Sequence, residues 1–239
     1  MPLQSNVGLF MKRSDLIAVL IFLAIIAAFA FCAPLLEGYT QFNAQHGYIT
    51  AFLKFALLAT FGEMLAARIR CGQYLPAGFG LVPRAVVWGL LGITIQFAFK
   101  VFAGGVPPTL EDLGLTNAAT ALQSELGFTR LLTAFSISVV MNVVYAPVMM
   151  TLHKITDLHI QEYQGSMQAL VHPIKVRAIM SERIDWKQMW SFVYKKTIPF
   201  FWIPAHTISF LLPAAYRTLF AALLGVALGL ILTIAVKKR

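Results

Sequence analysis

The stretch AVVWGLLGITIQFAFKVFAGG, residues 85–105, decides the fold class of this chain. Its side chains are apolar except for one hydroxyl, one amide and one ammonium group. An α-helix rises 1.5 Å per residue, so about 20 apolar residues cover the ~30 Å hydrocarbon core of a membrane. The stretch is therefore typical of a membrane-spanning helix.

Five further stretches are apolar over comparable lengths: 16–35, 48–67, 131–152, 197–213 and 216–236. A chain inside a bilayer must satisfy its backbone hydrogen bonds internally, and helices do so within one segment. The sequence therefore predicts an all-α fold, a polytopic transmembrane helical bundle with six crossings. Residues 1–239 are expected to form a single integral membrane domain. The stretch 197–213 is the shortest of the six and is interrupted by proline.

The basic residues lie in alternate gaps between these stretches. Most of the 19 Lys and Arg residues fall before 16, between 67 and 85, between 152 and 197, and after 236. Cytoplasmic loops are enriched in Lys and Arg, so both termini are expected on the cytoplasmic side. The N-terminus is not an Arg-rich presequence. The expected location is therefore the cell inner membrane of a bacterium, with an organelle membrane as the alternative.

The formal net charge of +9 does not indicate a nucleic-acid partner. Lys and Arg at helix ends orient the chain and contact anionic headgroups, at ~1 kcal/mol each. A nucleic-acid-binding protein instead gathers them on one soluble face among aromatic residues. The expected partners are the lipid bilayer and a small-molecule or ion solute. Cys32 and Cys71 are predicted at opposite membrane surfaces, too far apart for a disulfide.

The only long polar segment is the predicted inner loop, at about 154–196. Its second half mixes apolar and charged residues and includes Trp186 and Trp190. This composition predicts an amphipathic helix that lies in the membrane interface and leads the chain into the fifth crossing.

Six polar residues within the apolar stretches are candidates for lining a pore or a solute site. Polar groups at this depth are costly and usually face a bundle interior or a water-filled cavity. The candidates are Glu63, Gln96, Lys100, Asn142, His206 and Ser209. The alternative is that these polar faces only pack against neighbouring helices through hydrogen bonds.

Four glycines are candidates for close helix packing, because small residues let two backbones approach. They are Gly89, Gly92, Gly225 and Gly229. Gly225 and Gly229 form a G-x-x-x-G pattern, which pairs helices either within the chain or between copies in a homo-oligomer. Pro204 is expected to kink the fifth crossing near His206.

Over residues 49–236 the chain resembles the Mpv-type proteins, which are related to the 22-kDa peroxisomal membrane protein. The matching motifs are Gly62-Glu63, Arg84, Gly89-x-x-Gly92, Phe99-Lys100, Trp202 with Pro204, and Pro213 with Tyr216-Arg217. The resemblance implies a multi-helix, channel-like protein of organelle or bacterial membranes. Relatives are associated with weakly selective conduction or with the movement of small metabolites.

The favoured function is therefore a membrane channel or facilitator for small solutes or metabolites. One alternative is a non-conducting structural or assembly subunit of a membrane complex. An intramembrane enzyme is less favoured, because the sequence contains no H-E-x-x-H, G-x-S-x-G or P-loop motif. No metal or cofactor is expected, since the histidines of the inner loop match no metal-ligand spacing.

Overall fold

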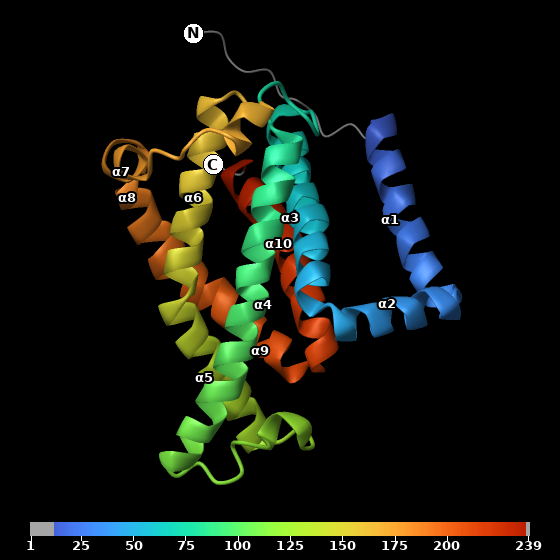
Figure 1. Ribbon diagram of the computed structural model, residues 1–239, viewed down its shortest axis with the longest axis vertical. Helices are drawn as coiled ribbons and strands as arrows, with labels where there is room; N and C mark the ends of the chain where they lie inside the picture. The colour runs from blue at the N-terminus through green and yellow to red at the C-terminus, as the bar shows by residue number, and fades with distance from the viewer. Residues whose placement is uncertain (1–11, 238–239) are drawn as a thin grey trace.

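The computed structural model describes residues 12–237, and the side-chain surroundings of all of these except 25, 26, 30 and 228–237. Every regular element in this range is helical, as the all-α class requires. The long helices are α1 (Arg13–Phe31), α2 (Ala33–Gln45), α3 (Gly47–Cys71), α4 (Leu81–Asp112), α5 (Phe128–Val144), α6 (Ala146–Glu162), α9 (Ile203–Leu211) and α10 (Ala214–Lys237). Figure 1 shows α3, α4, α5, α6 and α10 as a bundle, with α1 and α2 at one side.

Two of the described helices, α3 and α4, are each long and apolar enough to cross a membrane. Two bent pairs also qualify when each is taken as one span: α1 with α2, bent by 86°, and α5 with α6, bent by 45°. The described part of the chain thus has two to four candidate crossings by length and composition. Hydropathy alone predicts six, so the number of crossings depends on how the bent and shorter helices sit in the bilayer.

Proline explains both bends. Pro34 stands in the first turn of α2, and Pro147 stands in the first turn of α6. Proline has no backbone N–H and clashes with the preceding turn, so a helix ends just before it. The expected helices over 16–35 and 131–152 are accordingly broken at Cys32 and Tyr145. After the first break, α2 runs crosswise from the end of α1 to the start of α3, at the side of the bundle (Figure 1), and contains no buried residue.

The N-terminal end of α1 is attached to the end of α3. The Asp15 carboxylate binds the Arg68 guanidinium at 2.5 Å, and the Lys12 ammonium donates to the Gly72 carbonyl at 2.8 Å. Tyr74 lies in the following loop, where burial and a hydrogen bond to Asp15 raise the pKa of its phenol. Most apolar side chains along α1 are about half exposed, as expected for a helix that faces lipid.

Helices α3 and α4 approach closely at two of the predicted packing glycines. A Cβ on Gly92 would lie 2.7 Å from Phe55 Cβ and 2.8 Å from the Ala51 carbonyl oxygen. A Cβ on Gly89 would overlap the Phe52 ring. A side chain at Gly92 would require α3 to move, because its contacts are with the backbone and a Cβ, whereas one at Gly89 would require the Phe52 ring to move. Gly92 therefore sets the distance between these helices.

Helix α10 packs against α3 within the same chain. A Cβ on Gly62 would lie 2.9 Å from Val226 Cα, whereas a Cβ on Gly225 would lie 3.9 Å from Ala59 Cβ. The close approach therefore depends on Gly62, and Gly225 leaves room for a methyl group. The predicted partner Gly229 belongs to the part of α10 whose side-chain surroundings are outside the described set.

We expect Gly62→Ala to lower the free energy of unfolding by about 1 kcal/mol, because its methyl group must push against the α10 backbone. Gly225→Ala is the matched control on the facing helix and should cost less than about half of that. Unfolding of both variants by SDS in mixed micelles measures the difference. Equal losses would show that the packing distance is not set by Gly62.

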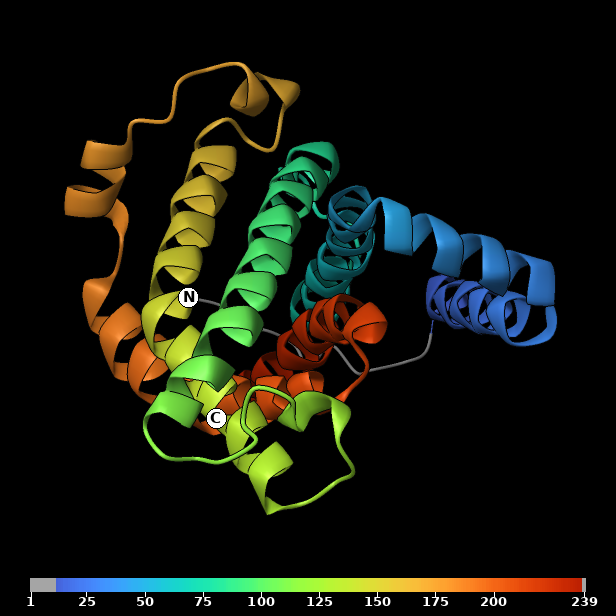
Figure 2. The same ribbon diagram turned by 60° about the horizontal axis from the view of Figure 1, so that its bottom comes forward.

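The inner loop is more broken than expected. Helix α6 extends to Glu162, and the chain then forms the short elements η2 (Met167–Leu170), α7 (Val176–Ala178), η3 (Ile179–Arg183) and α8 (Trp186–Gln188). Another short helix, η1 (Ala121–Gln123), lies in the loop before α5. Figure 2 shows the strip from α7 to α8 lying alongside α6. Ile155, Ile179, Ile184 and Met189 form a small core between them, and Glu162 binds Arg183 at 2.7 Å.

The predicted amphipathic helix is replaced by η4 (Met189–Trp202), a π-helix that runs directly into α9. Its wider turn is visible at its end, where the Ile203 backbone N–H donates to the Ile198 carbonyl five residues earlier. The change to α-helical geometry occurs at Ile203, next to Pro204 in the first turn of α9. Pro204 therefore lies where the helix type changes.

Candidate functional site

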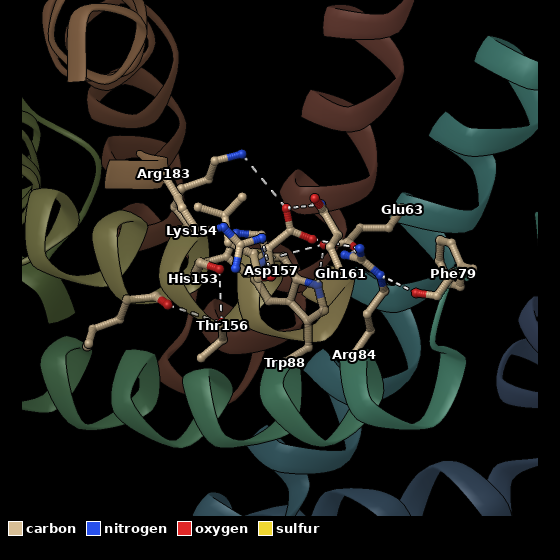
Figure 3. Close-up of polar contacts among 12 residues, drawn as sticks. Glu63, Phe79, Arg84, Trp88, His153, Lys154, Thr156, Asp157, Gln161 and Arg183 are labelled. Carbon is tan, nitrogen blue, oxygen red and sulfur yellow. Dashed lines mark hydrogen bonds and ion pairs between the residues drawn. The ribbon is translucent and has the colours of Figure 1, made fainter. Parts of the chain in front are cut away.

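Glu63 is the centre of a charged cluster at one end of the bundle. One carboxylate oxygen accepts from the Arg84 guanidinium at 2.5 Å. The other accepts from the Trp88 indole N–H at 2.9 Å and lies 3.1 Å from His153 Nε2. These partners come from α4 and α6, so Glu63 joins three helices, as Figure 3 shows.

Arg84 extends the cluster to a second carboxylate. Its guanidinium binds Asp157 at 2.6 Å and donates to the Phe79 carbonyl at 2.6 Å. The Lys154 ammonium lies 3.9 Å from the other Asp157 oxygen. We call Glu63, Arg84, Trp88, His153 and Asp157 the inner cluster. With Lys154 its formal charges balance, and the side chains of Arg84, Asp157 and Glu63 are only 12–21% exposed.

The spacing of the Glu63 partners along α4 and α6 brings their side chains together. Arg84 and Trp88 are four residues apart on α4, and His153 and Asp157 are four residues apart on α6. Residues at this spacing share one face of a helix. Sequence analysis singled out Glu63 but did not find His153, Asp157 or Trp88. The two pairs of residues spaced four apart were the sequence signal that could have identified them.

The inner cluster separates two cavities. One, of about 630 Å³, is lined by Arg70, Cys71, Phe79, Gln161 and other residues near the ends of α3, α4 and α6; we call it the inner vestibule. The other, of about 330 Å³, is lined mainly by aromatic and methionine side chains; we call it the apolar cavity. Glu63 and His153 belong to the walls of both.

Asn142 and His206 line the apolar cavity together with Trp202 and Phe99. The Asn142 side-chain amide lies 3.1–3.2 Å from His206 Nδ1 and donates to the Ser138 carbonyl at 2.8 Å. The His206 ring stacks on Trp202, with 5.2 Å between ring centroids, and meets the edge of Phe99 at 5.4 Å. The imidazole is therefore held in a defined orientation.

The other three candidates do not line either cavity. Gln96 accepts a hydrogen bond from the Thr218 hydroxyl on α10, and Ser209 is fully buried and donates to the Ala205 carbonyl at 3.1 Å. Lys100 is exposed, with its ammonium 4.7 Å from the centre of the Tyr48 ring. The predicted pore set is thus divided: Glu63, Asn142 and His206 meet in one cavity, and Gln96, Lys100 and Ser209 are used for packing or surface contacts.

The bundle is closed between α5 and α9. Ser138 donates to the Ile203 carbonyl at 2.7 Å and, like Ile137 and Phe210, has no exposed surface. Helices α5 and α9 are therefore tightly packed against each other at these residues.

Within residues 12–237, no three His, Cys, Asp or Glu side chains gather as a metal site would require. Cys32 and Cys71 are both free and exposed. Comparison with family models, with curated proteins and with solved structures finds no match to this chain. Its function is therefore argued from the geometry of the site and from the sequence.

Proposed function

We propose that this chain is a gated membrane channel or facilitator for small solutes or metabolites, of the Mpv type. The observation that carries the proposal is the pair of cavities that share Glu63 and His153. A solute path needs polar groups that face a hollow space, and Glu63 and His153 line both cavities. The ion pairs between the cavities would then act as the inner gate.

The proposed topology has six crossings with both termini on the cytoplasmic side, in a bacterial inner membrane or an organelle membrane. Supporting it, α1 begins and α3 and α6 end at the same end of the molecule, where α4 also begins (Figure 1). The basic residues Arg68, Arg70, Arg84 and Lys154 lie at or near this end. The bent pair α5 and α6, and η4 with α9, would each count as one crossing, and α10 as the last.

Flux measurements on reconstituted protein test the function. Wild-type proteoliposomes should take up small uncharged polyols or conduct ions faster than empty vesicles. We expect Glu63→Gln to raise this rate up to about tenfold, because losing one charge-assisted interaction of ~1.4 kcal/mol shifts a closed gate toward opening by that factor. The change keeps the size of the side chain and removes only its charge.

Glu162→Gln is the control, because Glu162 pairs with Arg183 in the inner loop and lines neither cavity. Its flux should equal that of the wild type. Wild-type vesicles that show no flux of any ion or polyol above empty vesicles would overturn the proposed function. So would equal flux in the Glu63→Gln and Glu162→Gln variants.

A further inference from the structure

We propose that the apolar cavity is a binding site for an uncharged solute with an apolar body and a hydroxyl group. Its role as a station on the solute path rests on the proposed function. The cavity, of about 330 Å³, lies at the lower end of the range of small-molecule sites. Much of its wall consists of Phe55, Phe99, Met141, Met149, Met150 and Phe192. Methionine and aromatic side chains adapt to flat or branched apolar bodies.

The charges on the wall disfavour an ionic solute. Glu63 and Lys154 supply the carboxylate and the ammonium group that line the cavity, and each already has an oppositely charged partner, Arg84 for Glu63 and Asp157 for Lys154. No charge is left over to compensate one carried by the solute. An ion transferred into apolar surroundings without such a partner is strongly disfavoured.

Two unsatisfied polar atoms lie on the stacked rings of Trp202 and His206. The Trp202 indole N–H is buried and has no hydrogen-bond partner in the described part of the protein. Asn142 occupies His206 Nδ1, and Nε2 forms no hydrogen bond with any described residue. Buried polar groups normally have a partner, so the Trp202 N–H indicates where a ligand group is missing, and the neighbouring His206 ring offers Nε2 beside it on the wall of the same cavity.

A hydroxyl group matches this pair of atoms. Its oxygen accepts from an indole N–H, and it also donates to or accepts from an imidazole nitrogen, according to the tautomer of His206. A purely apolar molecule would fill the cavity but leave both atoms unpaired. The geometry therefore points to an alcohol or phenol in preference to a hydrocarbon.

Quenching of tryptophan fluorescence by three iodinated probes tests the proposal at neutral pH. Trp88 and Trp202 line the cavity, so a Trp186→Phe, Trp190→Phe background leaves them as the only reporters. We expect saturable quenching by 4-iodobenzyl alcohol and about five- to tenfold weaker binding of iodobenzene, which lacks the hydroxyl. 4-Iodobenzenesulfonate should show no saturable quenching.

Two variants locate the binding site in the same background. Gly225→Leu fills the cavity from α10 and should abolish saturable quenching, whereas Gly104→Leu has open space around it and should not change quenching. His206→Phe keeps a ring between Trp202 and Phe99 but removes Nε2. It should reduce the preference for the alcohol over iodobenzene to about twofold or less.

Equal binding of the sulfonate and the alcohol would overturn the proposal, as would unchanged quenching in Gly225→Leu. A phospholipid that co-purifies with the protein and is not displaced by the alcohol would also overturn it, by assigning the cavity to an acyl chain. Binding is measured without transport, so the two proposals fail separately. Vesicles without flux contradict the proposed function, and flux without saturable binding contradicts only the assignment of the solute.

Discussion

Arg84→Met is expected to lower the free energy of unfolding by about 3 kcal/mol. The guanidinium of Arg84 lies between Glu63 and Asp157 and binds both carboxylates at 2.5–2.6 Å. Methionine keeps most of the length of the side chain but leaves the two acids without their shared cation. Breaking a largely buried pair in this way costs more than the pair itself contributes, because the remaining charges are desolvated and unpaired. The midpoint of unfolding by SDS in mixed micelles measures the loss.

Arg177→Met is the control for this experiment. Arg177 is exposed on α7, and its replacement should change stability by less than about 0.5 kcal/mol. The triple variant Arg84→Met, Glu63→Gln, Asp157→Asn separates charge from packing. It should recover at least half of the stability lost by Arg84→Met, since an uncharged set of similar size is often nearly neutral. A triple variant no more stable than Arg84→Met would contradict the electrostatic explanation.

Gly92→Ala is expected to lower the free energy of unfolding by about 2 kcal/mol. Its new methyl group would lie 2.7 Å from Phe55 Cβ and 2.8 Å from the Ala51 carbonyl oxygen. Rotation of a side chain cannot relieve these contacts. The Ala51 oxygen belongs to the backbone of α3, and the Phe55 Cβ is bonded directly to that backbone. Helices α3 and α4 must therefore separate, which also loosens the core around Phe55 and Phe99. The same SDS titration reports the change.

Gly104→Ala provides the comparison on the same helix. No atom lies within 4 Å of a Cβ at Gly104, so the substitution should be neutral or stabilise by up to about 1 kcal/mol through helix propensity. Helix propensity favours alanine equally at both positions. Gly92→Ala and Gly104→Ala variants of equal stability would show that the contact of α3 with α4 is not limiting.

Properties of single segments, apolar length and the position of proline, account for the long helices α3 and α4 and for two of the bends. Apolar lengths placed α3 and α4, and the positions of Pro34 and Pro147 explain the bends before α2 and α6. The sequence predicted unbroken helices over 16–35 and 131–152, so both bends were missed, although a proline stands at each. Proline alone does not decide such a break, since Pro107 and Pro108 lie inside α4. The π-helical geometry of η4 had no such signal, because widening a helical turn depends on what the whole segment packs against.

The candidate site was predictable only in part. The cost of a carboxylate in hydrocarbon made Glu63 a candidate whatever its neighbours. Gln96 and Lys100 were candidates on the same ground, as polar groups within an apolar stretch. The structure separates them: Gln96 meets Thr218 and Lys100 meets Tyr48, whereas Glu63 lies on two cavities.

The amino-acid sequence by itself determined the helical class, the two long apolar helices α3 and α4, and the polar groups within apolar stretches that need partners. Apolar length, proline and charge act within one segment, so they can be read one segment at a time. Only the tertiary structure decided that Glu63 meets Arg84, Trp88 and His153, and that Asn142 and His206 share its cavity. The physical reason is that the rotation and separation of whole helices decide which side chains come into contact. Those depend on close contacts far along the chain, such as Gly92 with Phe55 and Gly62 with Val226.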